Sequence, residues 1–115
     1  MAALDAEQVA VVDALVRDVS GTLGLRDEAE FKRYLIGEGE QAIDNGWTSL
    51  DMFSQKLVDD FQQRMHDEFV DVSWPRCPYH PHHPLSLSNG GWRCNQTDVE
   101  VARLGALQVA NGSGG

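Results

Sequence analysis

Apolar residues recur with a helical period in the first part of the chain. Between Asp5 and Leu23 they are spaced by steps of three and four: Val9, Val12, Val16, Val19 and Leu23. This spacing places them on one face of a helix, with Asp13, Arg17 and Asp18 largely outside it. Such a stripe is typical of packing within the same chain, and a surface for a partner helix is the alternative interpretation.

Two further helices follow in the pattern. One is predicted from Asp27 to the stop signal Asn45-Gly46, since Asp27 and Glu30 resemble a capping box. The other is predicted from Thr48, as its cap, to about residue 69. It carries the most regular apolar face, formed by Leu50, Phe53, Leu57, Phe61, Met65 and Phe69.

Two glycines stand inside the second predicted helix. Gly37 and Gly39 each lower helix stability by about 1 kcal/mol relative to alanine. We expect them to allow close packing against the first helix or to mark a local break.

The period changes from helical to alternating after Pro84. Leu85, Ser86 and Leu87 alternate as in a half-buried strand. Residues 88–91 contain Asn-Gly, the strongest short hairpin signal, and residues 92–94 form the returning strand.

A fourth helix is predicted after the hairpin. Thr97 and Glu100 resemble a capping box, and apolar residues follow, so we expect a helix from Asp98 to about Val109. The whole pattern predicts a mostly helical α+β protein. Residues 1–71 form an acidic three-helix part, and residues 72–110 form a hairpin and a helix packed on it as one domain. Residues 111–115 are expected to form a flexible tail.

Potential metal ligands gather around the hairpin. Both cysteines and three of the four histidines lie in WPRCPYHPHHPLSLSNGGWRC, residues 74–94. Cys77 and His80 form a C-x-x-H knuckle, His83 follows three residues later, and the hairpin carries Cys94 back. Thiolates and imidazoles are the ligands of tetrahedral Zn²⁺. The spacing predicts one zinc ion bound by Cys77, His80, His83 and Cys94, with His82 as the alternative to His83.

Other chemistry remains open for these residues. A Cys77–Cys94 disulfide requires an oxidising compartment and leaves the histidines unexplained. The cysteines could also be free thiols beside surface histidines. A Rieske-type iron–sulfur centre needs two Cys–His pairs, and only one is present. Two thiolates and two imidazoles would fill all four zinc positions, which favours structural over catalytic zinc.

The order of knuckle, hairpin and helix resembles small zinc-ribbon and treble-clef modules over about Trp74 to Val109. The resemblance implies structural zinc and a role in contacting protein or nucleic acid. It departs from the treble clef, in which the second ligand pair lies in the first turn of the closing helix. Here only Cys94 lies near that helix.

Trp74 and Trp92 flank the cysteines and are expected to pack over the hairpin, where Trp47 could join them.

The distribution of charge along the chain argues against a nucleic-acid-binding function. The net charge of the 115 residues is −9. Residues 1–71 hold 16 acids and 6 bases, a net −10, and residues 72–115 hold 2 acids and 3 bases, a net +1. Proteins bind duplex nucleic acid through lysine and arginine, so direct nucleic-acid binding is not expected. No apolar run is long enough for a transmembrane helix, and the N-terminus lacks a secretory pattern, so we expect no membrane association and a cytoplasmic location.

These observations favour a small zinc-binding protein that is not an enzyme. It would act in interaction or regulation, with its acidic helices facing a protein partner. One alternative is a zinc-dependent hydrolase, if one metal position is open to water. Another is an acidic nucleic-acid mimic that blocks a DNA-binding protein.

Overall fold

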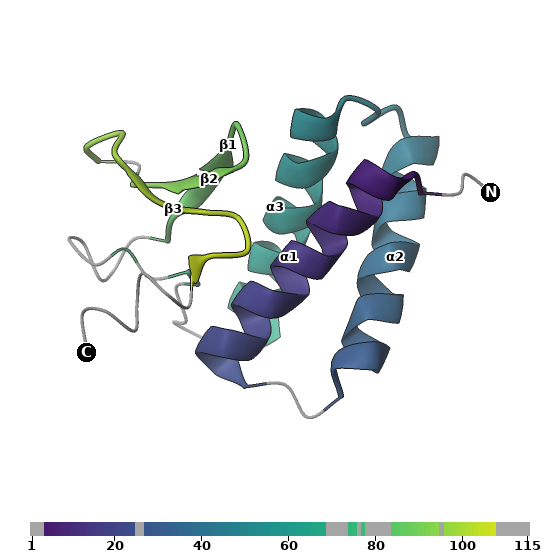
Figure 1. The fold of residues 1–115 in the computed structure, drawn as a ribbon, viewed down its shortest axis with the longest axis horizontal. Coiled ribbons are helices and arrows are strands. Elements are labelled where there is room, and N and C mark those ends of the chain that lie inside the picture. Colours follow the sequence, from purple (N-terminus) through teal and green to yellow (C-terminus); the bar gives the residue numbers. More distant parts are fainter. Residues whose placement is uncertain are drawn as a thin grey trace.

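The computed structural model of the chain describes residues 4–24, 27–68, 74–75, 77, 84–94 and 96–107. Three helices precede a small antiparallel sheet in this part of the chain, so the fold is α+β and mostly helical. The elements are α1 (Ala6–Leu23), α2 (Glu28–Asp44), α3 (Leu50–Glu68), β1 (Ser86–Ser88), β2 (Gly91–Arg93) and β3 (Glu100–Arg103). The sheet lies on one side of the helices, and α2 lies on the side away from it (Figure 1).

The first two helices begin where the capping patterns place them. The Asp5 carboxylate accepts a hydrogen bond from Gln8 N at 2.9 Å, and Gln8 Oε1 accepts one from Asp5 N at 2.9 Å. The Asp27 carboxylate accepts from Glu30 N at 3.0 Å. Each side chain satisfies a backbone N–H that has no partner within the helix. Both predicted helices are confirmed.

The third helix is also confirmed, but its predicted cap is wrong by one residue. Ser49 Oγ accepts a hydrogen bond from Met52 N at 3.1 Å, and Ser49 O accepts from Phe53 N at 2.8 Å. Ser49 therefore provides the first helical carbonyl together with the capping oxygen, and Thr48 lies before the cap.

The two glycines of α2 have different surroundings. A Cβ on Gly39 would lie 3.0 Å from the Phe53 ring and 3.3 Å from Leu4, whereas a Cβ on Gly37 would meet nothing within 4 Å. Gly39 therefore lets α2 approach α3, not the first helix as the sequence predicted. The helix runs through both positions without a break.

The predicted hairpin is confirmed. β1 and β2 pair with Leu87 opposite Trp92, and Ser88 opposite Gly91. The turn residues Asn89 and Gly90 both have positive φ, 52° and 74°. Asn-Gly tolerates this conformation, and it matches the twist of the two strands.

The helix predicted from Asp98 to Val109 is wrong for Asp98 to Ala106, because β3 occupies the first half of this range and no helix forms there. Residues 108–109 lie outside the described residues. β3 extends the sheet beside β2, with Ala102 opposite Trp92. Asp98 at φ 57° and Gly105 at φ 93° turn the chain at either end. A helix of about ten residues is marginal by itself, whereas the edge of β2 supplies partners for backbone hydrogen bonds.

A single hydrophobic cluster joins the helices to the sheet. Its buried members include Val12, Leu15, Leu35, Phe53, Leu57, Trp74, Leu85, Leu87, Trp92 and Leu107. Val12, Val16, Val19, Phe53, Leu57 and Phe61 of the predicted apolar faces are buried in the core, whereas Leu50 is 41% exposed. The cluster fixes the position of the hairpin on the helices.

Both tryptophans beside the cysteines belong to this cluster. Their rings meet edge to face at 5.5 Å between centroids, and the Trp74 ring meets Phe61 at 5.3 Å. Trp47 lies elsewhere, at the connection between α2 and α3. It is 37% exposed and contacts Lys56.

Candidate metal centre

The structure brings the two cysteines together from opposite ends of the hairpin segment. Cys77 and Cys94 are both buried, neither is in a disulfide, and the Cys77 thiol donates toward the Cys94 sulfur. Leu85 N donates to Pro75 O at 2.7 Å and so ties the chain before Cys77 to the start of the hairpin. His80 and His83, with their alternative His82, lie outside the described residues.

The backbone after Cys94 forms a tight turn around its sulfur. Asp98 N donates to Cys94 O at 2.7 Å, and Cys94 N donates to Val99 O at 2.9 Å. The Thr97 hydroxyl and the backbone N–H groups of Thr97 and Gln96 point at the sulfur. These groups, led by the Thr97 hydroxyl and joined by the Cys77 thiol, lower the pKa of the Cys94 thiol from 9.0 to about 6 against the opposing effect of burial. Thr97, predicted as a helix cap, instead favours a thiolate.

The two cysteine sulfurs would supply two of the four ligands of the predicted zinc site. A thiolate is the form that binds Zn²⁺, and hydrogen bonds from the turn stabilise that form. In the described part of the chain, no three Cys, His, Asp or Glu side chains gather around one point. The remaining ligands of a closed site would have to come from the histidines between Cys77 and Pro84.

A buried carboxylate holds the sheet on α1, and the sequence did not reveal it. Asp18 has no exposed surface. It accepts hydrogen bonds from Trp92 Nε1 at 2.8 Å, Gly105 N at 2.7 Å and Leu107 N at 2.9 Å. Three donors allow the carboxylate to stay buried. The signal was its spacing from Val11, Leu15 and Thr22 by steps of four, three and four, a second stripe beside the predicted one.

Polar contacts also fix the segment that leads to Cys77. Trp74 Nε1 donates to Thr22 Oγ1 at 2.9 Å, and Thr22 Oγ1 donates to Asp18 O at 2.7 Å. Gln62 Nε2 donates to Trp74 O at 3.0 Å and to Leu85 O at 2.7 Å. Side chains of α1 and α3 thus hold both ends of the segment from Trp74 to Leu85, in which three of the four predicted ligands lie.

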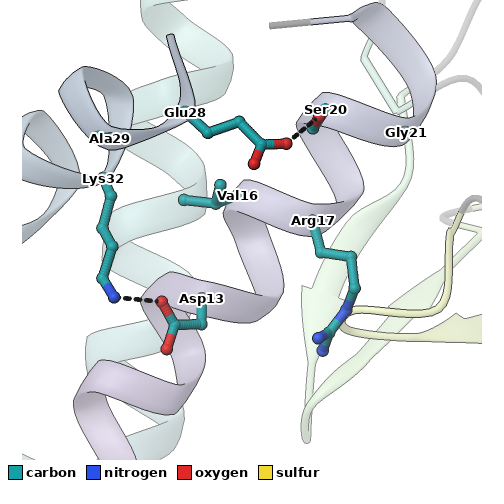
Figure 2. A pocket seen from close by; sticks show the side chains of 8 residues that line it. All are labelled: Asp13, Val16, Arg17, Ser20, Gly21, Glu28, Ala29 and Lys32. Atoms are coloured by element: carbon teal, nitrogen blue, oxygen red, sulfur yellow. Dashed lines mark hydrogen bonds and ion pairs between the residues drawn. The ribbon is translucent and has the colours of Figure 1, made fainter.

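A groove of about 520 Å³ lies between α1 and α2 (Figure 2). Its polar side chains are engaged with one another or with backbone. Lys32 Nζ lies 2.8 Å from Asp13 Oδ1, and the Ser20 hydroxyl donates to Glu28. The Arg17 side chain turns toward the sheet, where its Nε donates to Gly105 O at 3.0 Å. The groove therefore presents no set of catalytic or ligand-binding groups.

No known protein family, curated protein or solved structure matches this chain. The likeness to zinc-ribbon and treble-clef modules accordingly stays a prediction. None of the helices within the described ranges has the length and apolar character needed to cross a membrane.

Proposed function

We propose that this chain is a small protein stabilised by one structural Zn²⁺ that acts in interaction or regulation and not as an enzyme. The observation that carries the proposal is the meeting of two buried cysteine side chains, one of which is surrounded by hydrogen-bond donors that favour its thiolate. His80 and His83 would complete the tetrahedron, with His82 as the alternative to His83.

Zinc would supply a double positive charge that neutralises two thiolates in a buried place. Cys77 would bind from the segment before the hairpin, and Cys94 from the end of β2. Trp74 and Trp92 pack against each other and belong with both cysteines to the buried hydrophobic cluster. With four protein ligands no position is left for a water nucleophile, which favours a structural role.

The partner of this protein is proposed to be a basic protein. Residues 1–71 carry a net charge of −10, and many of their carboxylates, including Glu7, Asp13, Glu30 and Asp44, are exposed. Such a surface attracts a positively charged partner and repels nucleic acid.

Native mass spectrometry of the purified chain tests the metal. We expect one zinc ion per chain, and its loss in Cys77→Ser, Cys94→Ser and His80→Ala. Of His82→Ala and His83→Ala, only the variant that removes a ligand should lose the ion. His66→Ala is the control, because this residue lies outside the predicted cluster and its substitution should leave zinc in place.

Three results would contradict the proposal. A chain without stoichiometric metal would argue against zinc, and a mass lower by two hydrogens would indicate a Cys77–Cys94 disulfide. An X-ray absorption spectrum that reports three protein ligands and a water would favour the hydrolase over the structural site.

A further inference from the structure

Large apolar side chains are exposed where α2 connects to α3: Trp47 is 37% exposed, Leu50 41% and Met52 43%. Leu50 and Met52 are two residues apart on α3 and therefore lie on different sides of that helix. We call Trp47 and Met52 the corner patch. The other large apolar side chain of comparable exposure in the described ranges is Val99, which lies in the turn before β3. Tryptophan and methionine are enriched in protein interfaces, and a cluster of them on the surface marks a contact site.

Trp47 and Met52 border the same side of α3. Lys56 is one helical turn beyond Met52, and its Nζ lies 5.7 Å from the centre of the Trp47 ring. Asp59 is two turns beyond Met52 and therefore continues this side.

The surroundings of the corner patch are negative. Residues 44–60 contain four aspartates and one lysine, a net charge of −3. The lysine, Lys56, is already paired with Asp60 at 3.0 Å. Arg103, which reaches the hairpin turn from β3, is paired with Glu100 at 2.7 Å. Partial burial and the Asp60 carboxylate raise the pKa of Asp59, against the effect of Lys56, so a cation beside Asp59 would relieve repulsion.

The first turn of α3 is also held from the side of the sheet. Asn89 N, in the hairpin turn, donates to Asp51 Oδ1 at 2.9 Å. This contact fixes the hairpin turn beside the first turn of α3. The backbone turn of α3 that carries Met52 is therefore held in place before a partner binds.

We propose that the corner patch docks a basic segment of a partner protein. An apolar side chain of that segment would pack on Trp47 and Met52, and its lysines or arginines would lie beside Asp51 and Asp59. This rests on the proposed function, for which it names the contact site. A second copy of the chain fits poorly, since it would bring two surfaces of net charge −3 together.

The test is a titration of the ¹⁵N-labelled full chain with a synthetic amphipathic peptide of leucine and lysine, compared with the matching peptide of leucine and glutamate. We expect only the lysine peptide to bind, with chemical-shift changes concentrated in residues 44–60. The double variant Trp47→Ser/Met52→Ser should bind at least tenfold more weakly, and Asp59→Asn should reduce the salt dependence. Val99→Ser and Asp98→Asn, both outside the acidic helices, are matched controls that should bind as the unaltered chain does.

Other outcomes would overturn the inference. Shift changes spread over all acidic helices, or equal weakening in the two controls, would place the contact elsewhere and leave the proposed basic partner standing. Failure of the lysine peptide to bind would contradict both the corner patch as a contact site and the proposed basic partner. Dimerisation that Trp47→Ser abolishes in sedimentation would identify a second copy as the occupant. If the double variant folds poorly by circular dichroism, Asp59→Asn alone decides the question.

Discussion

Asp18 joins segments that are far apart in the sequence. It is the buried acceptor for one indole N–H and two backbone N–H groups, all from the last quarter of the chain. A buried carboxylate with several donors is stable, whereas its removal leaves each donor without a partner. Asp18 is therefore one of the side chains that hold the sheet on the helices.

Replacement of this residue should have a large effect on stability. Asp18→Ala is expected to lower the free energy of unfolding by about 3 kcal/mol or more, because three buried N–H groups lose their acceptor. Urea denaturation followed by tryptophan fluorescence measures it. Asp13→Ala on the same helix is the control, since its exposed ion pair with Lys32 is worth about 1 kcal/mol at most. A loss below that of the control would contradict the role of Asp18.

Cys94 provides a pH-dependent signature of the turn around it. In the metal-free chain the thiolate absorbance near 240 nm should rise with a midpoint near pH 6. Because the folded-state pKa lies below the ordinary value of 9.0, the thiolate adds stability above pH 9, and this contribution disappears as the pH falls through 6. Cys94→Ser should remove this step, and Thr97→Val should move it to higher pH. A midpoint near 9 in the unaltered chain would contradict the hydrogen bonds described.

At the residue scale, residues whose role follows from their own chemistry could be recognised in the sequence. Residues whose role follows from their burial and partners could not. The cysteines stood out because their chemistry is narrow and their spacing unusual. Asp18 did not, because an acid on a helix usually faces water, and its burial depends on donors more than 70 residues away. Thr97 fitted a helix cap and a thiol-binding turn equally well from local sequence alone.

At the scale of elements, α2 approaches α3 closely at a glycine, Gly39. A Cβ on Gly39 would lie 3.0 Å from the Phe53 ring, a tight contact that would require a small shift, while Gly37 on the same helix faces open space. Substitution of Gly37 therefore reports the effect of helix propensity alone, whereas substitution of Gly39 reports helix propensity and packing together.

Replacement of glycine by alanine is expected to have opposite effects on stability at Gly37 and at Gly39. Gly37→Ala should raise the free energy of unfolding by about 0.5–1 kcal/mol through helix propensity. Gly39→Ala should lower it, since overpacking of about 1–3 kcal/mol exceeds the same gain. Thermal unfolding followed by circular dichroism measures both. Equal stabilisation by the two variants would show that α3 can move away from Gly39 without loss.

The elements themselves were predictable where the signal was local. Regular apolar spacing and side-chain caps defined α1, α2 and α3, and Asn-Gly defined the hairpin. The helix predicted from Asp98 was wrong because the apolar spacing of this segment is compatible with a helix and with a strand. Pairing of Ala102 with Trp92, a tertiary contact, decided for a strand.

At the scale of the molecule, the acidic helices and the nearly neutral sheet share one hydrophobic cluster. The sheet has short strands and a small apolar face, so it depends on the helices and on the segment around the cysteines. Loss of the proposed zinc should therefore act first on the sheet.

Removal of zinc by a strong chelator should lower the melting temperature by more than about 10 °C, because metal binding and folding are coupled. Hydrogen exchange should show loss of protection in β1, β2 and β3 before α1 and α3. The Cys77→Ser variant is the control and should not respond to the chelator. Melting of the unaltered chain at the same temperature with and without chelator would argue against a structural ion.

The position of Asp18 also has a consequence for biosynthesis. The residue emerges from the ribosome early, whereas its three donors lie 74, 87 and 89 residues downstream. While translation continues, this carboxylate must stay hydrated, and the inner face of the nascent α1 cannot close over it. A chain that ends before Leu107 lacks one of the three donors to the Asp18 carboxylate. The sheet would then attach less firmly to α1, and such a truncated chain should be degraded more readily by cellular proteases.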